Sequence, residues 1–179
     1  DFDAVYKFGQ TVDVLTIEIE NVNVSALEAL EKEGKTVYPQ PHVLRTIQNK
    51  ASQKGFYQEC GIPTAPYTRF SQTAQLQKAV ENGDVDFPFV WKSARFGYDG
   101  QGVKMVRSAV DLAKLPNVEC IAEKLIDFKN ELAVIVARNA HGQCNTYPVV
   151  EMEFHPEANQ VEYVVCPARI DPKVAKKAQ

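Results

Sequence analysis

A lysine and three closely spaced glycines form the stretch of this sequence best suited to hold a charged ligand. Two apolar runs, FPFVWKS with Lys92 and VKMV, flank a loop that carries Gly97, Gly100 and Gly102. Glycine accepts positive φ and lets a ligand approach the backbone, and successive free N–H groups there make a concave anion site. Burying an unpaired Lys92 ammonium beside aromatic residues would be costly unless a phosphate neutralised it. The stretch therefore predicts a β-hairpin that cradles nucleotide phosphates.

A plain hairpin is the main alternative for this loop. The spacing G-x-x-G-x-G differs from the dinucleotide fingerprint, no helix pattern follows it, and no Gly-Lys-Ser/Thr run marks a P-loop. A wide turn whose glycines serve only the bulge and twist of the strands would explain the loop alone equally well. Lys92 and the later segment between Glu123 and Glu131 favour the phosphate site.

That later segment offers a second set of ligand-binding groups. The run CIAEK predicts a strand, and the chain that leaves it can present backbone C=O and N–H groups to the edge of a purine. Leu125 and Ile126 would then contact the apolar faces of the ring. Glu131 follows at a distance from which a carboxylate could bind two ribose hydroxyls. Taken singly, Glu123 and Glu131 are each better explained as solvated charges at strand ends.

Composition restricts the class of protein. The chain is 45% apolar and 24% charged, which is ordinary for a globular domain, and it has no apolar run long enough to span a membrane. A net charge of −3 argues against a general nucleic-acid-binding protein. The cysteines are Cys60, Cys120, Cys144 and Cys166. They form no C-x-x-C pair, so we expect reduced, mostly buried thiols of a cytoplasmic protein and no metal site.

The order of apolar patterns predicts an α/β (α+β) fold. Strands are expected at 12–20, 35–38 and 120–124, in the hairpin, and in three final runs that alternate like an antiparallel meander with one covered face. Helices are expected after Ser25, from Pro41 to Gly61, after Ser71 and from Ser108 to Leu115, with the three serines as N-caps or first residues. The last residues, DPKVAKKAQ, are typical of the first turns of a helix.

Seven runs also occur in the order found in one enzyme family. They are EIENV (18–22), VYPQPHVLRTIQNKASQK (37–54), GIPTAPY (61–67), FVWKSARFGYDGQG (89–102), AEKLIDFKNELAVIVARN (122–139), YPVVEM (147–152) and PARI (167–170). They cover nearly the whole chain, and GYDG with its preceding lysine is the most specific. On these runs the chain resembles the N5-carboxyaminoimidazole ribonucleotide synthetases, the ATP-dependent carboxylases of purine synthesis, which are ATP-grasp enzymes.

The resemblance implies a division into three parts. Residues 1–40 would end an N-terminal α/β (pre-ATP-grasp) domain, 41–122 would form the ATP-grasp lid with its Gly-rich hairpin, and 123–179 would begin the C-terminal grasp domain. The opening on Asp1 without a methionine and the unfinished final helix predict an internal piece of a longer protein. For the full-length enzyme the resemblance implies a cytoplasmic homodimer.

The resemblance also implies roles for individual residues around ATP. Lys50 would contact ATP, Lys92 would reach its phosphates, and Glu131 would bind the ribose. The loop that closes over the phosphates would be Gly97, Tyr98, Asp99, Gly100, Gln101, Gly102 and Val103. The segment that reads adenine would be Glu123, Lys124, Leu125 and Ile126. His155 matches a further ATP-site histidine, although the local spacing differs by about one residue.

The implied reaction is the carboxylation of 5-aminoimidazole ribonucleotide in IMP biosynthesis. ATP, Mg²⁺ and bicarbonate would give carboxyphosphate, which carboxylates the exocyclic amine, with Tyr98 and Asp99 near this substrate and Lys92 as the third catalytic residue. Two departures matter. Many relatives carry Arg or Lys where Gln101 stands, and the family's Mg²⁺ and bicarbonate residues fall beyond this chain, so we expect the chain alone to be inactive. Alternatives are an ATP-grasp ligase of the formate-dependent transformylase or biotin carboxylase type, or a non-catalytic nucleotide-binding fragment.

Overall fold

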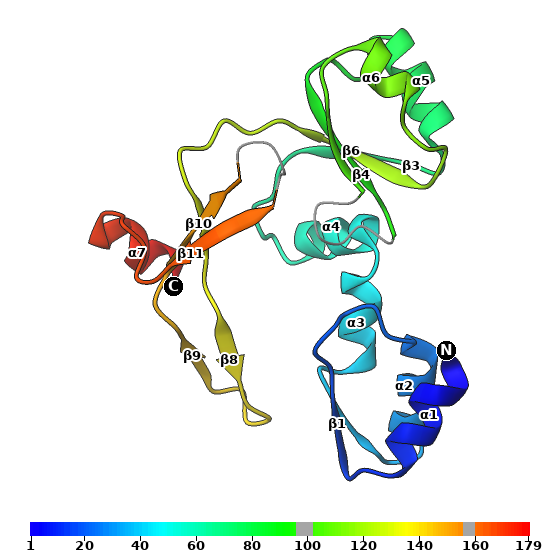
Figure 1. Ribbon diagram of the computed structural model, residues 1–179, viewed down its shortest axis with the longest axis vertical. Coiled ribbons are helices and arrows are strands. Elements are labelled where there is room, and N and C mark those ends of the chain that lie inside the picture. The colour runs from blue at the N-terminus through cyan, green and yellow to red at the C-terminus, as the bar shows by residue number, and fades with distance from the viewer. Residues whose placement is uncertain (96–101, 156–159) are drawn as a thin grey trace. The chain divides into compact units, whose positions relative to one another are not determined.

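The computed structural model describes residues 1–95, 102–155 and 160–179, which form two compact units, Asp1–Leu125 and Ile126–Gln179 (Figure 1). Helices and strands are interspersed in the first unit, and short strands followed by one helix make up the second. The predicted α/β (α+β) class is therefore confirmed. The division into three parts at residues 40 and 122 stays a prediction.

The first unit begins with three helices packed on a two-stranded parallel sheet. Helices α1 (Phe2–Gln10), α2 (Val24–Lys32) and α3 (Pro41–Ile47) accompany β1 (Val14–Thr16) and β2 (Thr36–Tyr38). Their buried core consists of Leu15, Val24, Leu27, Leu30, Val37 and Leu44. The strand predicted over 12–20 is shorter, because the chain leaves the sheet after Thr16 and exposes Glu18 and Glu20. The predicted cap of α2 was wrong by two residues: the Asn23 side chain accepts the Ala26 N–H at 2.9 Å.

The helix predicted from Pro41 to Gly61 is broken in two. Pro41 opens α3 as predicted, but a second helix, α4 (Lys50–Glu59), begins after Asn49. The buried Asn49 side chain accepts the N–H groups of Ala51 and Ser52 at 2.9 and 3.0 Å, which makes it the N-cap of α4. The break redirects the chain, so that α4 lies against a second sheet.

That second sheet has four antiparallel strands in the order β3-β6-β4-β5. The strands are β3 (Tyr67–Phe70), β6 (Cys120–Lys124), β4 (Phe89–Ser93) and β5 (Val103–Val106), so the predicted hairpin and the predicted strand at 120–124 are both confirmed. Helices α5 (Thr73–Glu81) and α6 (Ala109–Ala113) cover one face, and α4 lies on the other (Figure 1). The helix predicted from Ser108 to Leu115 is α6, with Ser108 as its N-cap, whereas α5 starts after Gln72 and not with Ser71 as its cap.

The second unit is an antiparallel meander bent into two small sheets. Its strands are β7 (Glu131–Ala133), β8 (Val136–Arg138), β9 (Cys144–Thr146), β10 (Val150–Phe154) and β11 (Val161–Val165), and α7 (Pro172–Ala178) follows. Strands β11-β10-β7 form one sheet and β8-β9 the other, so two of the predicted long strands are divided. At the bend the Tyr147 N–H still donates to the Ile135 oxygen, but Pro148 has no N–H with which to continue the ladder. The antiparallel pairing is confirmed, but β11 is largely exposed in the described residues and the expected covered face is not found.

A buried carboxylate ties the end of this meander to its sheet. Glu151 on β10 accepts hydrogen bonds from the Asn130 amide at 2.6 Å and from the Arg169 Nε and backbone N–H at 3.1 and 3.2 Å. The Arg169 hydrogen bonds, despite the opposing effect of desolvation, hold the pKa of Glu151 below its ordinary value. Arg169 also pairs with Glu153. The PARI run is thus attached to β10 through one arginine.

Two sequence-based expectations concern the surface. All four cysteines are free, but Cys60, Cys144 and Cys166 are exposed and Cys120 alone is buried, so the expectation of mostly buried thiols was wrong. No helix in the described part of the chain is long and apolar enough to cross a membrane.

The packing of α1 on α2 gives a stability prediction. A Cβ at Gly9 would lie 2.2 Å from Leu30 Cδ1, and Leu30 is fully buried. We expect Gly9→Ala to lower the free energy of unfolding by about 1–3 kcal/mol through overpacking. Gly55, in the interior of α4, serves as the control, because a Cβ added there would meet no atom within 4 Å among the described residues.

Gly55→Ala is expected to be neutral or to raise the free energy of unfolding by about 0.4–1 kcal/mol. Urea denaturation followed by circular dichroism measures both variants. Equal effects of the two substitutions would show that α1 does not pack on α2 through Gly9.

Candidate functional site

The predicted phosphate loop is held at its base by the hairpin. Lys92 pairs in register with Val103, and the Ser93 N–H donates to the Gly102 oxygen at 2.8 Å. Gly102 has a φ of 78°, the conformation for which glycine was predicted there. The other predicted loop residues, Gly97, Tyr98, Asp99, Gly100 and Gln101, lie outside the described residues. Their roles stay predictions.

The two faces of the four-stranded sheet carry different side chains. Because neighbouring residues of a strand point to opposite faces, Phe89 and Trp91 lie on one face of β4 and Val90 and Lys92 on the other. The first face is apolar and packs against α5 and α6. Glu123 on β6 stands opposite Val90 and therefore shares the Lys92 face, which α4 covers.

A buried carboxylate with two lysines occupies that second face. Glu123 is only 5% exposed, and its Oε2 lies 2.5 Å from Lys92 Nζ. Its Oε1 lies 2.6 Å from Nζ of Lys54, which reaches across from α4. Lys54 also donates to Thr64 Oγ1 at 2.5 Å, and its ammonium stands 5.7 Å from the centre of the Tyr67 ring. Helix α4 and strand β4 thus each supply one lysine to the single carboxylate of Glu123 on β6.

This cluster corrects two expectations. Lys92 does not depend on a phosphate for neutralisation, because Glu123 is its diagonal neighbour on the adjacent strand. Glu123 is not a solvated charge at a strand end but a buried one. Burial by itself raises the pKa of Glu123, yet the hydrogen bonds and charges of Lys54 and Lys92 outweigh it and lower this pKa below its ordinary value of 4.5. The carboxylate is thus ionised at neutral pH, and the cluster carries one net positive charge.

Lys54 is the site residue that sequence reasoning missed. It stands one helical turn after Lys50, so both side chains project from the same face of α4. That spacing was the available signal, but it does not reveal which of the two meets Glu123. Lys50 begins the helix, and its N–H donates to the Ala94 oxygen at 2.8 Å. The predicted ATP-contacting lysine therefore lies beside the start of the loop.

The predicted adenine-reading segment continues from β6. Lys124 closes the strand, with its N–H bonded to the Pro66 oxygen at 2.8 Å, and Leu125 ends the first unit. Glu123, Lys124 and Leu125 all border a pocket of about 520 Å³. Its other walls include the rings of Tyr67, Phe87 and Pro88, together with the carboxylates of Asp84 and Asp86. The rings offer flat surfaces to a ligand, and the polar groups offer hydrogen-bond partners at its edges.

The remaining predicted residues belong to the second unit. Ile126 is 45% exposed, and Glu131 opens β7 opposite Met152. His155 follows β10, and its N–H donates to the Gln160 oxygen at 2.9 Å. Just before it, the pairing of β10 with β11 shifts register between Glu153 and Phe154. Because Lys92 belongs to the first unit, a site shared by it and these three residues stays a prediction.

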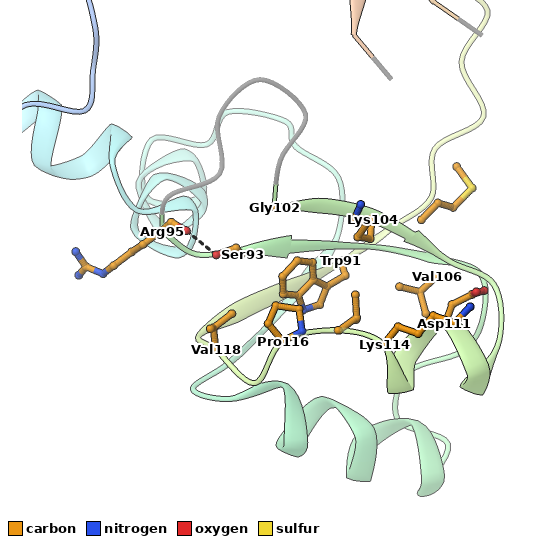
Figure 2. A pocket seen from close by; sticks show the side chains of 12 residues that line it. Trp91, Ser93, Arg95, Gly102, Lys104, Val106, Asp111, Lys114, Pro116 and Val118 are labelled. Atoms are coloured by element: carbon orange, nitrogen blue, oxygen red, sulfur yellow. Dashed lines mark hydrogen bonds between the residues drawn. The ribbon is translucent and has the colours of Figure 1, made fainter. Parts of the chain in front are cut away.

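The apolar face of the hairpin has a pocket of its own. Figure 2 shows Trp91 between the hairpin and the segment that contains Pro116 and Val118, with Lys104 along the β5 edge, in a pocket of about 580 Å³. The Arg95 side chain points away from this pocket, and the backbone oxygen of Arg95 accepts from Ser93 Oγ at 2.5 Å. The pocket lies on the face opposite Lys92 and Glu123, so it is separate from the lysine–carboxylate cluster.

Across residues 1–95, 102–155 and 160–179, no three His, Cys, Asp or Glu side chains gather in a way that could hold a metal ion. The acidic groups that are buried there, Glu123 and Glu151, are already paired with lysine or arginine.

Two family models match this chain. Residues 55–179 match the ATP-grasp domain, and residues 1–48 match the ribonucleotide synthetase preATP-grasp domain. The chain therefore belongs to the ATP-grasp family, as its motifs predicted.

Individual relatives show which enzymes of this family the chain is similar to. The N5-carboxyaminoimidazole ribonucleotide synthase of Synechocystis sp. is 36% identical over 100% of this chain and 45% of the relative. A structure of carboxyaminoimidazole ribonucleotide synthase from Aspergillus clavatus complexed with ATP is 35% identical, with a TM-score of 0.88 over 100% of this chain and 47% of that one. A further structure from the same organism, in complex with ADP and 5-aminoimidazole ribonucleotide, is 32% identical, with a TM-score of 0.87 over 100% and 46%. This chain spans about half the length of the relatives it matches.

The buried carboxylate gives a pH prediction. Because the pKa of Glu123 is lower in the folded chain than its ordinary value, its contribution to stability is present above about pH 4.5 and lost as pH falls through the folded pKa. Glu123→Gln should lower the free energy of unfolding at neutral pH by about 3 kcal/mol, since two lysines lose a buried partner. This difference from wild type should shrink as the pH is lowered to about 3.

Trp91 is the only tryptophan and lies in the same sheet, so its fluorescence in urea follows unfolding of this part of the chain. Glu28→Gln is the matched control, because it removes an exposed ion pair with Arg45 and should cost at most about 1 kcal/mol. If the two variants lost the same free energy of unfolding at neutral pH, the buried Glu123 carboxylate would contribute no more than an exposed ion pair, and the prediction would be wrong.

Proposed function

We propose that this chain binds ATP and forms part of a ligase that carboxylates 5-aminoimidazole ribonucleotide with bicarbonate. The observation that carries the proposal is the likeness of the whole chain to the synthases solved with ATP, and with ADP and 5-aminoimidazole ribonucleotide. A hairpin with a lysine at its base and a strand end with apolar walls supply groups suited to phosphate and to a purine.

The proposed reaction has two chemical steps. A bicarbonate oxygen attacks the γ-phosphorus of ATP, the bond to the β-phosphate oxygen breaks, and ADP leaves behind carboxyphosphate. The exocyclic amine of the ribonucleotide then bonds to the carboxyl carbon while the carbon–oxygen bond to phosphate breaks, releasing phosphate and an amine proton. The product is the N5-carboxylated ribonucleotide. An acyl phosphate hydrolyses readily, so the site must exclude water during the second step.

The chain's own residues would act mainly on ATP. Lys92 would bind a phosphate oxygen, where its charge stabilises the negative charge that develops during transfer. Gly102 and Val103, with the rest of the loop, would offer backbone N–H groups to the phosphates. Backbone groups of the segment from Glu123 to Ile126 would read the edge of adenine, while Leu125 contacts its face.

Further residues complete the proposed site. Lys50 would approach ATP from the start of α4, Glu131 would bind the ribose hydroxyls, and His155 would contact ATP from the end of β10. Tyr98 and Asp99 would lie near 5-aminoimidazole ribonucleotide, and closure of the loop over the phosphates would exclude water. Gln101 cannot supply the positive charge that Arg or Lys gives in many relatives, so this contact would be weaker or come from another residue.

Mg²⁺ is implied by this chemistry, but the described residues do not provide a site for it. No three candidate ligands gather among them, and the buried carboxylates are already paired with cations. We therefore assign no step of the reaction to a metal held by this chain.

The proposal is tested with the intact protein and its substrates. We expect ADP formation that requires both bicarbonate and 5-aminoimidazole ribonucleotide, measured by a coupled assay. Lys92→Met should reduce kcat/KM for ATP by about a hundredfold or more, because a charged contact to the transferring phosphate is lost.

Lys104→Met is the matched control, since Lys104 belongs to the same hairpin but points to the opposite face. It should leave kcat/KM near the wild-type value. Absence of bicarbonate-dependent turnover, or the same modest loss in both variants, would contradict the proposal.

A further inference from the structure

We infer that Lys54 is a positioning residue for nucleotide binding: it neutralises Glu123, so that Lys92 is free to leave that carboxylate for a phosphate. The inference rests on the proposed function, because it concerns how the ATP site is prepared. It assigns to Lys54 an effect on ATP affinity without any contact between Lys54 and ATP.

The two lysines differ in how firmly they are held. Lys54 has a side-chain exposure of 11% and is fixed by the Glu123 carboxylate, by Thr64 Oγ1 and by the Tyr67 ring. Lys92 has a side-chain exposure of 29%, and in the described part of the chain Glu123 is its one polar partner. Lys92 also lies beside the hydrogen bond that closes the base of the loop. A phosphate bound near the more exposed Lys92 would therefore attract Lys92 and leave Lys54 in place.

The charges explain why both lysines are needed. Glu123 is too buried to be left ionised without a cation, because removing one partner of a buried ion pair exposes the other to the full cost of desolvation. With Lys54 present, Lys92 can turn to a phosphate while Glu123 keeps one ammonium at 2.6 Å. Without Lys54, a phosphate must compete with Glu123 for the ammonium of Lys92 alone. If the phosphate bound it, the buried Glu123 carboxylate would be left unpaired near an anionic ligand. Loss of Lys54 should therefore weaken ATP binding.

A double-mutant cycle tests this coupling. A non-hydrolysable ATP analogue is titrated calorimetrically into the intact wild-type protein and into Lys54→Met, Glu123→Gln and the variant with both changes. We expect Lys54→Met alone to raise the Kd by about tenfold to a hundredfold, as for the loss of a close charge coupling. In the Glu123→Gln background the same change should have almost no effect, because no buried charge then retains Lys92.

Two further variants distinguish the effect of the Lys54 charge from that of its hydrogen bond to Thr64. Thr64→Val removes a hydrogen bond of Lys54 but keeps its charge, so it should raise the Kd much less than Lys54→Met does. Lys54→Gln, which lacks the charge but can still donate to Thr64, should behave like Lys54→Met and replaces it if the methionine variant does not fold. Trp91 fluorescence confirms that each variant is folded under the conditions of the titration.

The outcomes are distinct. An equal rise in Kd with and without the Glu123 carboxylate would mean that Lys54 binds ATP directly, and an unchanged Kd would mean that Lys54 is only structural; either overturns the inference. Lys92→Met serves as the reference for the proposed function. If it weakens binding while Lys54→Met does not, only the role of Lys54 fails. If wild type itself does not bind the analogue, the proposed function fails.

Discussion

The ionised carboxylate of Glu123, buried between two ammonium groups, is the constraint on which the four-stranded sheet and its helix depend. It joins β6 to β4 through Lys92 and to α4 through Lys54. Such a charge can stay buried only while it is compensated, so the elements that supply the lysines must keep their positions. The break at Asn49, which sends α4 across this face of the sheet, is therefore part of the same arrangement.

The opposite face of the sheet holds an apolar core. Phe89, Trp91 and Ala122 pack with residues of α5 and α6 in an apolar core. Strand alternation assigns Trp91 to this core and its neighbour Lys92 to the cluster. Side chains on one face of the five-residue strand β4 thus pack in the core, while Lys92 projects from the other face. The backbone of Lys92 is fixed in this way, while its side chain stays 29% exposed.

Sequence patterns predicted those helices and strands that are determined by neighbouring residues. The hairpin, the strand at Cys120–Lys124 and the helix starts at Pro41 and near Ser108 all follow from the sequence nearby. The break at Asn49 was missed because the periodicity continues across it, and the cap becomes visible only when Asn49 is seen to bond Ala51 and Ser52. Lys92 and Glu123 were both identified as site residues, but their contact, and that of Lys54, joins residues far apart in the sequence. No local signal encodes such a contact, and the roles of Tyr98 and Asp99 still rest on resemblance alone.

The central claim is that Lys92 exchanges Glu123 for a phosphate while Lys54 stays on the carboxylate. A crystal structure of the intact protein with an ATP analogue tests it most directly. The account predicts Lys92 Nζ within hydrogen-bond distance of a phosphate oxygen and away from Glu123, with Lys54 Nζ still paired to Glu123 and to Thr64. Lys92 remaining on Glu123 beside a bound nucleotide, or Lys54 turning to the phosphates, would contradict it.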